Sequence, residues 1–215
     1  MKIGIVGTGD VGRVLGAGLA ALGHDVKIGS REPGSAKLKA WQAKAGARAS
    51  TGSFADAARF GDVIIVATLW SGTENALTLA GAANLKGKVV IDATNPLVFA
   101  PGKPPALALG HTDSGGEQVQ RWIPDARVVK AFNIVGNASM VTPSFPGGPP
   151  DMFICGNDAE AKTTVTTLLA ELGWPATDIG GIEGARLLEP LCILWVVYGI
   201  KTGGWHHAFK MLRTS

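Results

Sequence analysis

The fold of this chain is decided by one stretch near its start, Lys2-Ile3-Gly4-Ile5-Val6-Gly7-Thr8-Gly9-Asp10-Val11-Gly12. Its first half is a short apolar, β-branched run of the kind that forms a buried strand, and its second half is a Gly-x-Gly-x-x-Gly motif. After the motif, apolar residues recur at helical spacing through Leu15 and Leu19 and stop at Gly23. The stretch therefore predicts a strand, a tight turn and a helix.

Each glycine of the motif has a physical role in such a turn. Gly7 allows a sharp reversal, Gly9 lets a pyrophosphate approach the backbone, and Gly12 lets the helix lie close to the strand. The start of the helix adds free N–H groups and a partial positive charge, which attract a diphosphate. Because a second apolar strand, 25–29, follows at βαβ spacing, we predict a dinucleotide-binding turn rather than a purely structural one. Its residues are Gly7, Thr8, Gly9, Asp10, Val11 and Gly12.

The end of the second strand indicates which dinucleotide is bound. A site built for NAD places Asp or Glu there, because a carboxylate accepts hydrogen bonds from the ribose hydroxyls. This chain has Gly29-Ser30-Arg31 instead, so that a hydroxyl and a guanidinium stand where the 2′-phosphate of NADP would lie. The alternative is a solvated turn before the next helix. We favour NADP over NAD on this feature.

The βαβ pattern continues and predicts an α/β, Rossmann-type, doubly wound parallel sheet with a small C-terminal α/β part. We expect an NADP-binding Rossmann domain over residues 1–138, with strand order 3-2-1-4-5-6, and a C-terminal α/β domain over 139–215. The further strands are expected at 47–50, 62–67, 88–92, 126–133, 152–155 and 176–179, and the further helices at 35–45, 53–59, 73–82, 115–122, 159–172 and 183–198.

The carboxyl ends of the parallel strands predict where the rest of the cofactor lies. In this fold, ligands gather between the carboxyl ends of the first and fourth strands, so Thr68, Leu69 and Trp70 are expected to line the nicotinamide half of the cofactor. Asn95 and Asn133 stand at the tips of the next two strands and are further site candidates, whereas Thr94 could equally be a hydrogen-bonded turn residue.

A stretch rich in Pro and Gly, 97–114, is expected to be an irregular flap beside the active site, because long loops without structure of their own are usually functional or mobile. His111 lies in this flap and is the one histidine placed where it could contact substrate. A lone histidine in a loop, such as His24, is more often a surface residue.

Composition excludes several classes of protein. Among the 215 residues, 46% are hydrophobic and 17% charged, and the net charge of +3 is too small and too scattered to indicate nucleic-acid binding. Cys155 and Cys192 are far apart and form no disulfide or metal-ligand spacing, which fits a reducing cytoplasm and no metal site. The longest apolar run, 191–200, is too short to span a bilayer, and the start on a core strand suggests no signal peptide.

The last predicted helix is apolar around most of its circumference, from Leu187 to Tyr198. One domain core can cover only one side of such a helix, so we expect the other side, with Trp195 and Val196 on it, to form a homodimer interface.

Several motifs together resemble one family, the NADPH-dependent coenzyme F420 reductases, or deazaflavin-linked NADP oxidoreductases. They occur in order over essentially the whole chain: Gly7-Thr8-Gly9-Asp10-Val11-Gly12, Gly29-Ser30-Arg31, Trp70, Asp92-Ala-Thr-Asn-Pro96, Ser114-Gly-Gly-Glu-Gln118, Val128-Val-Lys-Ala-Phe-Asn133, Cys155-Gly-Asn-Asp158 and Ala185-Arg-Leu-Leu-Glu189.

The resemblance implies NADP(H) held by Thr8 and the glycine turn, with the 2′-phosphate on Ser30 and Arg31. It places the carboxamide near Val135 to Asn137. It also implies a small-molecule acceptor, coenzyme F420 or a flavin such as FMN or FAD, stacked on the nicotinamide near Asn95, Pro96 and Leu97.

Hydride transfer between two flat rings requires orientation and water exclusion rather than a protein acid or base, so we predict no catalytic side chain. His111, Lys130 and Asn133 are the groups that could contradict this, although Lys130 on a buried strand more often pairs with a carboxylate. Two alternatives remain: an NADPH-dependent reductase of a small imine or hydroxy acid, and a non-catalytic NADP-sensing module.

Overall fold

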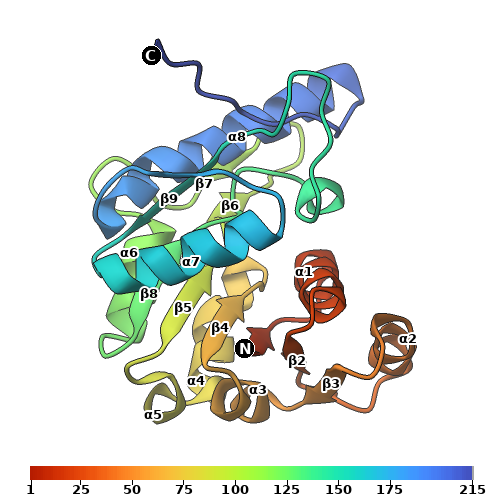
Figure 1. Ribbon diagram of the computed structural model, residues 1–215. Coiled ribbons are helices and arrows are strands. Elements are labelled where there is room, and N and C mark those ends of the chain that lie inside the picture. Colours follow the sequence, from red (N-terminus) through yellow and green to blue (C-terminus); the bar gives the residue numbers. More distant parts are fainter. Residues whose placement is uncertain (215) are drawn as a thin grey trace.

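β1 (Lys2–Val6) lies inside an eight-stranded sheet in the computed structural model, which describes residues 1–214 (Figure 1). The strand order is β10-β9-β8-β5-β4-β1-β2-β3, and the six strands from β3 to β8 are parallel. The predicted 3-2-1-4-5-6 order and the doubly wound fold are therefore confirmed. The other strands of the sheet are β2 (Asp25–Gly29), β3 (Ala49–Gly52), β4 (Val63–Val66), β5 (Val89–Asp92), β8 (Arg127–Lys130), β9 (Met152–Gly156) and β10 (Ala176–Asp178).

Helices cover both faces of this sheet, which is why β4 and β5 are buried throughout and apolar except for Asp92 at the end of β5. One core lies under α1, α2 and α7 and contains Leu15, Leu38 and Leu168; in Figure 1, α7 crosses in front of it. The other core lies under α3, α4 and α6. The helices are α1 (Asp10–Ala21), α2 (Ala36–Ala45), α3 (Phe54–Phe60), α4 (Thr73–Ala80), α5 (Ala82–Leu85), α6 (Gly115–Trp122), α7 (Ala159–Glu171) and α8 (Ala185–Thr202), with 3₁₀ turns η1 (Trp70–Gly72), η2 (Asn137–Ser139) and η3 (Ile182–Gly184).

The C-terminal part continues the same sheet. β9 pairs with β8 in the antiparallel direction, through Val129 with Gly156 and Lys130 with Cys155. β10 then pairs with β9 in parallel. The small C-terminal α/β part thus shares one sheet with the nucleotide-binding part, and the boundary after residue 138 stays a prediction.

The Pro/Gly-rich stretch 97–114 is more regular than the sequence indicated. β6 (Leu97–Val98) and β7 (Ala106–Leu107) pair as an antiparallel hairpin. Its tip contains a turn in which Lys103 N donates to Ala100 O across Pro101 and Gly102, and Gly102 has φ +70°. Proline at the second position and a glycine with positive φ at the third are what such a turn requires. The expectation of an irregular flap was wrong for Leu97–Val98 and Ala106–Leu107, because these residues pair as two strands.

α8 lies at the top of the molecule in Figure 1. The side of α8 that packs against the core is not the side that we expected. Trp195 and Val196 are only 9% and 8% exposed, so placing them on an outer face was wrong. The exposed apolar residues of α8 are instead Leu187, Leu194, Val197, Tyr198 and Ile200. The error arose because a helix that is apolar on most sides does not reveal which side meets the core.

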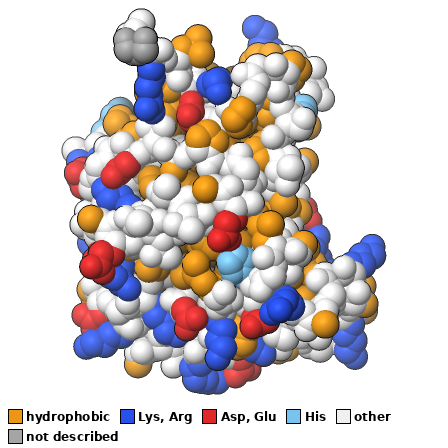
Figure 2. Space-filling view, viewed as in Figure 1, with side chains coloured by type: hydrophobic (Ala, Val, Ile, Leu, Met, Phe, Trp, Pro, Cys, Tyr) orange, Lys and Arg blue, Asp and Glu red, His pale blue; other side chains and the backbone are white. Residues whose placement is uncertain are grey.

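Charged side chains of both signs are interspersed along the lower part of the face in Figure 2, without a large patch of one sign. Within residues 1–214, no helix combines the length and the apolar character needed to cross a membrane.

Candidate active site

A cleft of about 1260 Å³ opens over the carboxyl ends of β1 and β4. Its walls are the glycine turn, the end of β2, the segment after β4 and the loop that follows β8. Two tryptophans from the C-terminal part, Trp195 and Trp205, complete it. The cleft therefore lies at the crevice where this fold binds ligands.

The glycine turn has the geometry that its sequence predicted. Gly7 has φ +127°, and a Cβ there would stand 2.2 Å from Ala67 O; a Cβ on Gly12 would stand 2.5 Å from Gly7 O. Both positions therefore require glycine. A Cβ on Gly9 would instead have its nearest neighbour, Ala67 O, at 4.0 Å, so this position stays open toward the cleft.

The start of α1 provides an anion site at this turn. Gly9 is the N-cap residue and has no side chain to accept from the first N–H groups of the helix, and Gly9, Asp10 and Val11 all line the cleft. Asp10 in the first turn is paired with Arg13, which also donates to Thr8 O at 3.0 Å. This pairing reduces the repulsion that a carboxylate would exert on a bound diphosphate.

The end of β2 carries the groups predicted for the 2′-phosphate. Ser30 and Arg31 both line the cleft, and Ser30 Oγ accepts from Glu32 N at 2.9 Å. Lys37, in the first turn of α2, lines the same region and was missed by the sequence analysis. Neither Arg31 nor Lys37 takes part in any ion pair among residues 1–214, so both cations are available to a ligand.

In the segment after β4, the residues before η1 line the cleft, whereas the first residue of η1 does not. Thr68 and Leu69 line the cleft as expected. Trp70 does not, because η1 turns its ring to stack on Trp122 with 5.3 Å between centroids, near the position of Gly115.

The loop after β8 forms the far end of the cleft, and its Val135, Gly136, Asn137 and Ala138 all line it. A Cβ on Gly136 would stand 2.8 Å from the Trp195 ring, so glycine allows this tryptophan to pack directly behind the loop. No sequence signal linked Trp195 or Trp205 to the site, because they lie some 60 residues further along the chain.

Known proteins are similar to this chain in sequence. The family described as NADP oxidoreductase, coenzyme F420-dependent, matches residues 2–96. The F420-dependent NADP reductase of Methanocaldococcus jannaschii is 35% identical over 211 residues, which are 94% of this chain and 93% of that protein. The chain belongs to this family. It is thereby an NADP-dependent oxidoreductase, as the motifs predicted.

Two further comparisons extend over most of the chain. A crystal structure from Arthrobacter sp. FB24, provisionally assigned as an F420-dependent NADP-reductase, has a TM-score of 0.93 and 41% identity, over 99% of this chain and 100% of that one. Metalloreductase STEAP3 of Rattus norvegicus is 30% identical over 88% of this chain, which corresponds to 36% of that protein.

The residues present fit the nucleotide that this family binds. The open position at Gly9, the uncapped start of α1 and the two unpaired cations Arg31 and Lys37 match a diphosphate followed by a ribose phosphate. Gly9, Arg31 and Lys37 all line the same cleft.

The side chains predicted for the acceptor of this oxidoreductase lie elsewhere. Asn95 and Asn133 hold each other: Asn95 Nδ2 donates to Asn133 O at 2.8 Å, and Asn133 Nδ2 donates to Asn95 Oδ1 and to Leu188 O, both at 3.0 Å. Asn133 is buried, and its Oδ1 has no hydrogen-bond partner within the described part of the chain, residues 1–214. Pro96 is buried and Leu97 begins β6; none of the four lines the cleft. We infer that the amide pair ties α8 to the strand tips.

His111 lines a second groove of about 760 Å³, together with Arg186, Leu187 and Ile193. This groove lies between the end of the hairpin and α8, and it shares no lining residue with the large cleft. The structure thus does not bring His111 to the nucleotide.

A buried ionic cluster joins β5, β8 and α8 through Asp92, Lys130 and Glu189. Lys130 Nζ lies 2.9 Å from Asp92 Oδ2 and 2.8 Å from Glu189 Oε1, and the three side chains are 0–1% exposed. Glu189 also accepts from Gly115 N and Gly116 N at the start of α6, at 3.0 Å each. Burial alone would lower the pKa of Lys130, but attraction to the two carboxylates outweighs it and raises this pKa to about 12. The expectation that Lys130 pairs with a carboxylate is confirmed.

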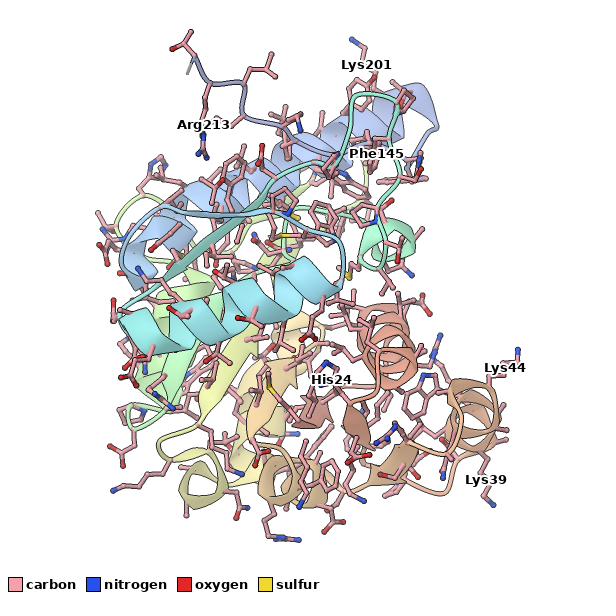
Figure 3. The ribbon with its side chains drawn as sticks, viewed as in Figure 1. His24, Lys39, Lys44, Phe145, Lys201 and Arg213 are labelled. Carbon is pink, nitrogen blue, oxygen red and sulfur yellow. The ribbon has the colours of Figure 1, made fainter. Side chains whose placement is uncertain are left out.

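The other titratable groups have structural surroundings. His24 is 6% exposed and its Nε2 lies 2.6 Å from Glu171 Oε2 at the end of α7, so its expected surface position was wrong (Figure 3). The turn that contains it is covered by a helix distant in sequence. Burial raises the pKa of the Cys155 and Cys192 thiols to about 12. Among the described residues, no group of three or more His, Cys, Asp or Glu could hold a metal ion.

Proposed function

We propose that this oxidoreductase transfers hydride between NADPH and a flat, flavin-like acceptor, with coenzyme F420 as the first candidate. The observation that carries this proposal is the distribution of titratable groups in the cleft. The titratable lining residues, Asp10, Arg31, Glu32 and Lys37, come from the glycine turn and the β2–α2 connection, whereas the end formed by residues 135–138 and the tryptophans has none. Bound NADPH supplies the hydride. At this end of the cleft, the protein therefore needs only to orient the acceptor ring and to exclude water. The named relative from Methanocaldococcus jannaschii supports the same acceptor.

We further propose that the adenosine end of NADP is selected by three groups. The Ser30 hydroxyl, the Arg31 guanidinium and the Lys37 ammonium surround the position after β2, where a 2′-phosphate would follow the ribose. The start of α2, a helix of ten residues, faces the same region and adds a partial positive charge.

Two other functions remain as alternatives. Reduction of a small imine or hydroxy-acid precursor would require a proton donor beside the nicotinamide, and the lining residues of that end include no acid, lysine or histidine. A sensing module would bind NADPH without oxidising it. Transfer of hydride to an acceptor therefore separates the proposal from both.

The proposed chemistry predicts an isotope effect in a single turnover. The protein is first loaded with NADPH that carries deuterium at the transferred position, and is then mixed with oxidised F420 or FMN. The rate of acceptor reduction should fall by the factor typical of a primary deuterium isotope effect. Stopped-flow absorbance measures it, because steady-state turnover can hide the step behind product release. If the wild-type protein reduces neither compound, the proposed function is wrong.

The same assay tests the absence of a protein acid or base. His111→Ala should keep single-turnover rates within about tenfold of the wild type, because a lost general acid or base costs about 10²–10⁴-fold. A loss in that larger range, with NADPH binding unchanged, would favour the imine or hydroxy-acid alternative.

We propose that the protein is a cytoplasmic homodimer that buries the exposed face of α8. Leu187, Leu194 and Ile200 are 66%, 55% and 57% exposed, and several large apolar side chains exposed along one helix are unusual on a free surface. Both cysteines are free thiols, as is usual in a reducing compartment.

Leu194→Glu should convert a dimer into a monomer without unfolding it, because Leu194 faces outward and a carboxylate cannot be buried unpaired between two helices. Sedimentation velocity measures the change. Leu79→Glu is the matched control, since Leu79 is 49% exposed on α4 and should leave assembly unchanged. A wild-type protein that sediments as a monomer at high micromolar concentration would refute the dimer.

A further inference from the structure

We propose that Trp205, carried by the C-terminal segment after α8, is the ring-binding wall of the acceptor site and sets its specificity for flat aromatic acceptors. This inference rests on the proposed function. Trp205 lines the cleft at the end formed by residues 135–138 and Trp195. It is 49% exposed, a large apolar surface that a ligand ring could cover.

The position of Trp205 relative to the inner wall indicates which ring it meets. Ala67 and Val135 line the inner side of the cleft, and each is only 7% exposed. Trp195 is only 9% exposed, and its ring packs against Gly136. The nicotinamide, which arrives with the diphosphate along the glycine turn, belongs against this inner wall. Trp205 is left for the second ring, which enters from solvent.

The ring of Trp205 is held in place by its neighbours. Its six-membered ring packs on Gly199 so closely that a Cβ there would stand 2.5 Å from Cε3. Its other neighbour is Trp195, with 5.3 Å between ring centroids and an angle of 42° between planes. Because this side chain is already ordered, it loses little conformational freedom when a ligand binds, and stacking on it therefore contributes more to affinity.

The chain that follows Trp205 is also fixed. Trp195 Nε1 donates to His207 O at 2.7 Å, His207 Nε2 lies 2.9 Å from Trp195 O, and the two rings stack with centroids 4.7 Å apart. His206 stacks on Phe145, and further along Arg213 donates to Thr177 Oγ1 at 2.8 Å. Figure 3 labels Arg213, which lies in this segment as it returns over α8, and Phe145, which lies in the loop that His206 contacts. The segment thus acts as a strap that presents one indole to the cleft.

The test compares Trp205→Ala and Trp205→Phe with the wild type in a complex that cannot react. With saturating NADP⁺ and oxidised F420, no hydride can move, so calorimetry measures the acceptor Kd alone. Trp205→Ala should raise this Kd about tenfold and Trp205→Phe about threefold or less, because phenylalanine keeps a stacking face. The Kd for NADP⁺ should change by less than about twofold in both variants.

The control is Trp122→Phe, since Trp122 stacks on Trp70 away from the cleft and should leave both Kd values unchanged. Lumiflavin, which has the ring system without a phosphate-bearing side chain, should lose affinity by the same factor as F420. An unchanged F420 Kd in Trp205→Ala, a loss confined to NADP⁺, or a loss seen with F420 but not with lumiflavin would each overturn the inference. The proposed function would stand if these variants still reduced F420, and it would fall separately if the wild type did not. Should Trp205→Ala fail to fold, Trp205→Phe and its Kd decide the question.

Discussion

Lys130→Met is expected to lower the free energy of unfolding by about 3–5 kcal/mol, the largest stability effect that we predict for one substitution. Lys130 is the single cation between two carboxylates, Asp92 and Glu189, and all three side chains are excluded from water. Removing it leaves two buried negative charges whose mutual repulsion is no longer balanced. Urea unfolding, followed by circular dichroism, measures the change.

A surface pair provides the control for Lys130→Met. Lys86 lies 3.3 Å from Asp125, and its side chain is 71% exposed, so Lys86→Met should cost less than about 1 kcal/mol. A loss of less than about 1 kcal/mol for Lys130→Met as well would show that the buried cluster contributes little.

Arg31→Ala is expected to weaken NADPH binding about tenfold to a hundredfold and to leave NADH binding nearly unchanged. A charge-assisted hydrogen bond to the 2′-phosphate is worth about 1.5–3 kcal/mol, and only NADPH carries that group. Lys37→Ala should cause a smaller loss for the same reason, because a single ammonium lacks the two-pronged geometry of the guanidinium. Titrations followed by the fluorescence of the reduced nucleotide measure the Kd values of NADPH and NADH for each variant.

The control for this prediction is Arg48→Ala. Arg48 pairs with Asp25 at 2.8 Å at the opposite end of β2, so its removal should change neither Kd. Equal affinity of the wild-type protein for NADPH and NADH would rule out NADP selection by Ser30 and Arg31.

The sequence predicted the nucleotide-binding half of the site because the signals there are local. The sharp turn at Gly7 and the close approach at Gly12 are demands on single residues, and only glycine meets them, so the spacing of the motif was sufficient. Likewise, Ser30 and Arg31 directly follow a strand whose direction the βαβ pattern already defines. The order of the six parallel strands of the main sheet followed from the same pattern.

The acceptor half was decided only by tertiary structure. Whether Trp195 faces inward and whether Trp205 reaches the cleft depend on how the C-terminal segment folds back over α8. Whether Asn95 and Asn133 turn toward each other depends on where the two strand tips meet α8. An apolar helix with no polar side carries no mark of which face meets the core, and residues separated by tens of positions acquire their contacts only when the sheet and α8 are assembled. Local backbone geometry is specified residue by residue, whereas the shape of a cavity is a property of several distant segments at once.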